Sequence, residues 1–179
     1  SADFVYAANG SSTIVAKLQT FPGRYDELRL PDASLSGPTA IALGDFDGNE
    51  LLDIAVTGRD SKDLVLIYQL PGRDFFSDRR YLRAGETLDG PIGLVAEDFD
   101  GDGDTDFAVL DTATGEDSRV VVFLQEGGAA APAACDASDN GSRACSYDLE
   151  DVVWADLTSG DLDGDGDTDL AAVADGRSA

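Results

Sequence analysis

The sequence contains no histidine and no methionine, only two cysteines, and 12 Lys and Arg residues against 36 Asp and Glu residues. The absence of histidine removes the commonest general base and a usual ligand of zinc and iron. The formal net charge of −24 argues against nucleic acid or an anionic membrane as a partner, because both bind basic surfaces. No apolar run approaches the length of a membrane span, so we expect no membrane insertion.

The chain has 179 residues, which is enough for one domain with a sizeable core. It shows no recognisable signal peptide and, as noted, no methionine. We therefore expect it to be a processed or excised part of a longer polypeptide.

Five aspartates occupy alternate positions in the segment 161–169, which reads Asp-Leu-Asp-Gly-Asp-Gly-Asp-Thr-Asp. So many carboxylates repel one another unless a cation lies among them. Oxygen ligands favour a hard cation, and Ca2+ takes six to eight oxygens in flexible geometry. We therefore predict a Ca2+ site whose ligands are the carbonyl of Asp167 and the side chains of Asp161, Asp163, Asp165 and Asp169.

The same loop occurs twice more in the chain. The segment 98–106 is nearly identical, and the segment 45–53 keeps the ligand positions but has Glu50 where the others have glycine. Glycine at this position would let the backbone curl around an ion. The three copies start 53 and 63 residues apart, and repeats of this length are typical of propellers or solenoids.

Short segments of strand-forming residues surround the loops in a recurring order. An apolar strand leads into the loop, a second strand leaves it and a hairpin leads to a third, as in 39–46, 53–58 and 64–68. A more polar fourth strand follows, as in 79–83. Four strands in about fifty residues are the layout of a propeller blade. No helical periodicity of useful length is present.

We therefore predict an all-β fold, an arc of a β-propeller built from four-stranded antiparallel blades. Three to four blades are visible and the arc is incomplete at both ends, so residues 1–179 form a single partial domain with repeats at about 1–34, 35–86, 87–150 and 151–179. The third repeat carries an inserted surface loop, roughly Glu126 to Tyr147. So few blades do not close a ring, so we expect a longer parent chain or self-association through the incomplete blades.

The strand–Asp-Phe-Asp-Gly-Asp-Gly-Asp-Thr-Asp–strand pattern resembles the FG-GAP/VCBS repeat of integrin-α-type β-propellers. The resemblance implies up to three structural Ca2+ ions, bound in loops that join the first two strands of a blade, while partners bind other surfaces. Glu50 and the small number of blades depart from that pattern. The implied ligands, in which Leu51, Asp104 and Asp167 act through their carbonyls, are Asp45, Asp47, Asn49, Leu51 and Asp53; Asp98, Asp100, Asp102, Asp104 and Asp106; and Asp161, Asp163, Asp165, Asp167 and Asp169.

The EF-hand is an alternative interpretation of the loops, because it shares the opening Asp-x-Asp-x-Asp-Gly. An EF-hand also requires a glutamate at position 12 and flanking helices. Position 12 is Val56, Val109 or Ala172 here, and the residues around it alternate as in strands. The sequence therefore argues against an EF-hand.

The sequence favours a non-catalytic, secreted or cell-surface segment that serves adhesion or binds a protein or carbohydrate. Millimolar calcium outside cells would fill even sites of about 10⁻⁴–10⁻³ M. The alternative is a propeller in a secreted carbohydrate-active or other hydrolytic enzyme that uses paired carboxylates. A carboxylate pair with raised pKa values, in a cleft away from the loops, would favour the enzyme.

The two cysteines, Cys135 and Cys145, lie in the inserted loop, with Asn140-Gly141 between them. This short loop can fold back on itself, and an extracellular setting keeps a disulfide bond formed. We therefore expect a Cys135–Cys145 disulfide.

Overall fold

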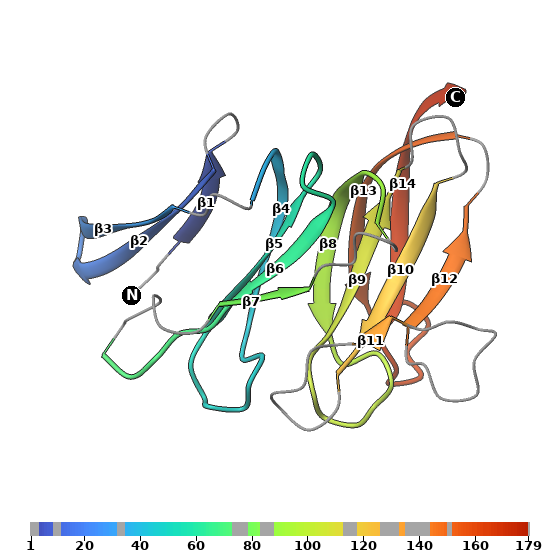
Figure 1. Ribbon diagram of the computed structural model, residues 1–179. Coiled ribbons are helices and arrows are strands. Elements are labelled where there is room, and N and C mark those ends of the chain that lie inside the picture. Colours follow the sequence, from blue (N-terminus) through green and yellow to red (C-terminus); the bar gives the residue numbers. More distant parts are fainter. Residues whose placement is uncertain are drawn as a thin grey trace.

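The computed structural model describes residues 4–8, 12–31, 35–72, 79–82, 88–112, 118–125, 133–134, 144–149 and 152–178. These residues form strands and turns, and none of them is helical. The strands make four antiparallel sheets that follow one another along the chain (Figure 1). The chain is thus all-β, an open arc of propeller-like sheets, as the sequence predicts. None of the described segments forms a helix of the length and apolar character that crossing a membrane requires.

Each sheet is built from strands that are consecutive in sequence. The first sheet contains β1 (Phe4–Ala8), β2 (Thr13–Phe21) and β3 (Arg24–Pro31). The second contains β4 (Pro38–Gly44), β5 (Asp53–Gly58), β6 (Asp63–Ile67) and β7 (Arg79–Leu82). The third contains β8 (Pro91–Glu97), β9 (Asp106–Asp111), β10 (Arg119–Leu124), β11 (Ala133–Ala134) and β12 (Ala144–Asp148), and the last contains β13 (Val152–Gly160) and β14 (Asp169–Ser178).

The three aspartate loops occupy equivalent places in this architecture. Each loop connects two paired strands, and its last aspartate pairs with the residue that ends the preceding strand. The three pairs are Gly44 with Asp53, Glu97 with Asp106, and Gly160 with Asp169. Because the register is the same, all three loops lie at one edge of the arc, the lower edge in Figure 1.

The inserted loop is shorter than the sequence predicts. Its last residues, from Ala144, belong to β12, which pairs antiparallel with β10 and places Tyr147 opposite Val120. The prediction of a loop up to Tyr147 is therefore wrong, because an outer strand pairs through its backbone and needs little apolar sequence. Cys145 lies in β12 opposite Val122, and Cys135 falls outside the described residues.

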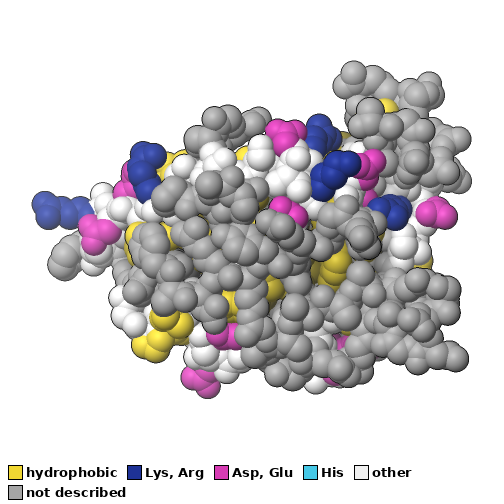
Figure 2. All heavy atoms as spheres, viewed as in Figure 1, with side chains coloured by type: hydrophobic (Ala, Val, Ile, Leu, Met, Phe, Trp, Pro, Cys, Tyr) yellow, Lys and Arg dark blue, Asp and Glu magenta, His cyan; other side chains and the backbone are white. Residues whose placement is uncertain are grey.

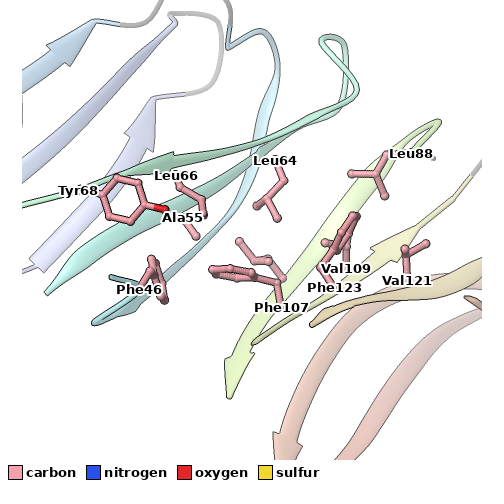
Figure 3. Packing of buried hydrophobic residues seen from close by; sticks show 11 residues of the cluster. Phe46, Ala55, Leu64, Leu66, Tyr68, Leu88, Phe107, Val109, Val121 and Phe123 are labelled. Atoms are coloured by element: carbon pink, nitrogen blue, oxygen red, sulfur yellow. The ribbon is translucent and has the colours of Figure 1, made fainter. Parts of the chain in front are cut away.

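The two central strands of the second sheet, β5 and β6, are buried on both faces and are mostly apolar. Side chains alternate between the faces of a strand. Ile54, Val56, Val65 and Ile67 pack toward the first sheet in one cluster with Ile14, Leu30 and Leu35. Ala55, Leu64 and Leu66 pack toward the third sheet, with Phe107, Val109, Val121 and Phe123 (Figure 3). The core is therefore a series of layers between consecutive sheets.

The first strands of the sheets approach one another closely. β8 contacts both β4 and β13. A Cβ atom at Gly93 of β8 would lie 3.1 Å from Leu110 Cβ and 3.3 Å from Leu157 Cβ, so this position has little room for a side chain. Trp154 of β13 packs partly buried against the cluster that holds Leu110 and Leu157. This close packing fixes the spacing of the loops at the edge of the arc.

Candidate metal sites

The first aspartate of each loop holds the loop in its curled form. Asp45 Oδ1 accepts hydrogen bonds from the amides of Gly48 (2.8 Å) and Asn49 (3.0 Å), and its Oδ2 accepts one from Glu50 N (2.7 Å). Asp98 holds the second loop in the same way, with hydrogen bonds from Gly101 N to Oδ1 (2.8 Å) and from Gly103 N to Oδ2 (2.9 Å). Asp161 holds the third loop, with hydrogen bonds from Gly164 N to Oδ1 (2.7 Å) and from Gly166 N to Oδ2 (3.2 Å).

The curled backbone requires the left-handed region at the fourth and sixth loop positions. In the second and third loops both positions are glycine, with φ between 75° and 98°. In the first loop the sixth position is Glu50, with φ of 64°. The prediction that the backbone freedom of glycine is useful at this position is confirmed, because all three residues there have positive φ. A side chain in this region costs about 1 kcal/mol.

Exchanging the sixth-position residues should therefore change stability in opposite directions. We expect Glu50→Gly to stabilise the protein by up to about 1 kcal/mol and Gly103→Glu to destabilise it by a similar amount, because each change only relieves or adds the left-handed strain. Urea unfolding at saturating Ca2+ measures both. A loss of stability in Glu50→Gly would show that this carboxylate contributes more than its backbone costs.

The ninth residue of each loop closes the loop against the strands. Asp53, which is fully buried, accepts hydrogen bonds from Phe46 N (2.8 Å) and Gln69 N (2.6 Å). Asp106, also fully buried, accepts them from Phe99 N (2.9 Å) and Gln125 N (2.7 Å). In the third loop Asp169 accepts one from Leu162 N (2.9 Å). In the first two loops, one carboxylate thus binds both the start of the loop and the glutamine that follows the third strand of the sheet.

The sequence alone did not predict that Gln69 and Gln125 donate hydrogen bonds to the ninth-position aspartates. Both donate through the backbone amide, which has no residue signature. Glutamine does, however, follow the third strand in both repeats, and this recurrence was a usable signal.

Burial acts against the charged form of the two buried aspartates. Desolvation raises the pKa of Asp53 to about 6, while the amides of Gln69 and Phe46 oppose the rise and the nearby Asp47 and Asp45 add to it. Desolvation also raises the pKa of Asp106. A divalent cation among these carboxylates would reverse the balance and stabilise their charged forms.

Three carboxylates converge in every loop. They come from the first, third and ninth positions, and within each group one oxygen per residue lies within 4.8 Å of the others. Oxygens bound to one Ca2+ at about 2.4 Å are at most about 4.8 Å apart, so a single ion fits each group. The groups are Asp45, Asp47 and Asp53; Asp98, Asp100 and Asp106; and Asp161, Asp163 and Asp169.

The fifth-position aspartates of the second and third loops, Asp102 and Asp165, are not among these groups. Asp102 Oδ1 accepts a hydrogen bond from Asp104 N (2.9 Å), and Asp165 Oδ1 accepts one from Asp167 N (3.0 Å). Asn49 Oδ1 accepts the equivalent bond from Leu51 N (2.8 Å), and its Nδ2 donates to the Gln69 carbonyl (3.1 Å). These are local Asx-turns, in which a short side chain bonds the amide two residues on. Ligation by the fifth-position side chains and by the carbonyls of Leu51, Asp104 and Asp167 stays a prediction.

A repeated antiparallel sheet with an aspartate loop between its paired strands defines a repeat of the β-propeller type. The family of FG-GAP-like repeats matches residues 45–109, from the first residue of the first loop into β9. The chain therefore contains an FG-GAP-type repeat. The third loop lies beyond this match, but it has the same sequence pattern and the equivalent hydrogen bonds within the loop to Asp161 and Asp169. A comparison with curated proteins found no match.

Proposed function

We propose that this chain is a non-catalytic propeller segment in which Ca2+ ions stabilise the blades. The observation that carries the proposal is the convergence of three carboxylates at the same place in three consecutive sheets. An ion in each group would join the start of the loop to the strand that leaves it. It would also offset the repulsion that these carboxylates exert on one another.

The donor set favours Ca2+ over Mg2+. All the predicted ligands are oxygens on a loop of small residues, which suits the flexible six- to eight-fold coordination of Ca2+. Mg2+ requires a tighter octahedral shell at 2.0–2.1 Å and gives up its water reluctantly. We therefore propose a structural role for Ca2+, with Mg2+ as a poor substitute.

We place the segment outside the cell, on a secreted or cell-surface protein, where it binds a protein or carbohydrate or supports adhesion. Millimolar extracellular calcium would keep such loops filled. The large negative charge suits a solvated surface and a cationic ligand.

The hydrolytic alternative gains no support from the described part of the chain. The carboxyl groups there with raised pKa values, Asp53 and Asp106, both belong to the loops. The buried Asp111 lies away from the loops but is paired with Arg119 (3.0 Å) and accepts hydrogen bonds from the amides of Asp89 and Gly90. These contacts give Asp111 a structural role.

Calorimetric titration of the chelator-treated chain tests the calcium proposal. We expect three Ca2+ sites, with the first loop weakest because Asn49 replaces a carboxylate and Glu50 adds backbone strain. Asp98→Ala and Asp161→Ala should each remove a tight site, and Asp45→Ala should remove the weakest. The ranking is wrong if Asp45→Ala abolishes the tightest site.

The predicted Cys135–Cys145 disulfide tests the extracellular location. A bond that closes so short a loop should add about 3 kcal/mol or less. We expect no free thiol in the native, unreduced protein and two after reduction, measured by a thiol reagent in denaturant. Two thiols before reduction would contradict both the bond and the location.

A further inference from the structure

Consecutive sheets of this chain pack against each other by a fixed rule. In the strand that leaves an aspartate loop, the first residue after the last aspartate packs toward the preceding sheet, and the second packs toward the following sheet. These residues are Ile54 and Ala55 in the second sheet, and Phe107 and Ala108 in the third. Because side chains alternate along a strand, each sheet has one face of each kind.

The last sheet exposes the face that packs toward a following sheet in the two sheets before it. Leu170 packs toward the third sheet, so Ala171 and Val173 lie on the opposite face. Val173 is 56% exposed, and Asp156, its partner across the strands, is also exposed. We call this surface, which consists of Asp156, Thr158, Ala171 and Val173, the trailing face.

The first sheet exposes a face of the other kind. Val5 packs toward the second sheet, so its neighbour Tyr6 lies on the opposite face, together with Val15, which pairs with Tyr6. The register of β2 with β3 places Tyr25 on this face too. Tyr6 and Tyr25 are each 41% exposed. We call this surface, which also carries Lys17, Glu27 and Arg29, the leading face.

The charges on the two faces are opposite in sign. On the leading face, Lys17 and Arg29 both form ion pairs with Glu27, which leaves one net positive charge in this cluster. Figure 2 shows Lys and Arg side chains at the left end of the molecule, where Figure 1 places the first sheet. The trailing face carries Asp156. A positive sheet face in a chain with 36 acidic and 12 basic residues is therefore complementary to the trailing face.

We propose that two copies of this chain pair end to end, with the trailing face of each copy on the leading face of the other. The two faces lie at opposite ends of the arc, so they do not meet within one chain (Figure 1). In the pair, β14 of one copy faces β1 of the other, and Val173 packs toward Tyr6 as residues of consecutive sheets do.

The pair is a closed assembly. Each copy uses both of its faces, so two-fold symmetry gives two identical contacts. Two copies with four sheets each make eight sheets, within the range of about four to eight blades in propellers. The inference goes beyond the proposed function, because none of the predicted Ca2+ ligands belongs to either face.

The test is sedimentation equilibrium of the calcium-loaded chain over a range of concentrations. We expect a mass of two chains that does not grow further. Val173→Arg places a cation opposite the cationic cluster, and Tyr6→Glu places an anion opposite Asp156, so each should weaken pairing at least about tenfold. Leu52→Arg is the matched control. Leu52 is 60% exposed in the first loop and outside both faces, so this variant should pair like the unchanged chain.

Mixing the two weakened variants tests the end-to-end arrangement. In a mixed pair, one contact has two unchanged faces, and the other brings the new arginine opposite the new glutamate. We therefore expect the mixture of Val173→Arg and Tyr6→Glu to pair more tightly than either variant alone. Two copies that met through the same face would gain nothing from mixing.

Four outcomes would overturn the inference. They are a single-chain mass at every concentration, a mass that keeps growing with concentration, equal weakening by Leu52→Arg, and a mixture that pairs no better than its components. Calcium titration of the same samples separates the two proposals. If three Ca2+ ions bind but the chain does not pair, only the pairing fails; if the chain pairs but binds no Ca2+, only the proposed function fails.

Discussion

Removing calcium should lower the melting temperature of this protein by about 20 °C. An ion that binds only the folded state adds about 2.7 kcal/mol at a hundredfold excess over its Kd, so three sites add about 8 kcal/mol. For a chain of this size, each kcal/mol corresponds to about 2–4 °C. Differential scanning calorimetry in excess Ca2+ and in chelator measures the difference.

Charge screening needs its own control, because the net charge is −24 and any added salt weakens the self-repulsion. Mg2+ at the same concentration screens equally but fits the loops poorly, so it should restore only part of the lost stability. Asp98→Asn and Asp161→Asn should each reduce the calcium-dependent shift by about a third. An identical recovery in Mg2+ would attribute the whole effect to screening.

Phe46→Ala should destabilise the calcium-loaded protein by about 3–5 kcal/mol, the usual cost of deleting a buried aromatic ring. Phe46 is 1% exposed, and its ring meets that of Phe107 edge to face, with centroids 4.8 Å apart (Figure 3). This pair joins the first loop to the third sheet. The substitution would leave a cavity between the second and third sheets, and neither sheet can move to fill that cavity.

Leu162→Ala is the matched control for this variant. Leu162 holds the same second position in the third loop, and its amide donates to Asp169 as the Phe46 amide donates to Asp53. Its side chain, however, is 67% exposed, so its loss should change stability by no more than about 0.5 kcal/mol. Urea unfolding of both variants at saturating Ca2+ gives the comparison. Equal losses would mean that the second position acts through the loop backbone and not through the core.

Much of the fold could be predicted because the three aspartate loops are recognisable in the sequence and show where one strand ends and the next begins. Each aspartate loop marks the junction of two strands, and the alternating apolar segments around it mark the rest. β12 was missed because Ala144–Asp148 is polar and follows a segment rich in glycine and alanine. Its place is set by backbone pairing with β10, which leaves almost no trace in residue type.

The grouping of carboxylates in the loops could also be predicted from the sequence. The spacing of first, third and ninth aspartates indicates three carboxylate groups, and the structure brings these residues together. What the sequence could not give was the burial of Asp53 and Asp106, which depends on the neighbouring sheets.

The number of Ca2+ ions bound to the native chain tests the central proposal most directly. Equilibrium dialysis against millimolar Ca2+, followed by metal analysis, should give three ions per chain. Replacing the ninth-position aspartate of one loop, as in Asp106→Asn, should reduce the number to two. A chain that binds no Ca2+, or that keeps three ions after this substitution, would contradict the proposal that each aspartate loop binds one Ca2+ ion.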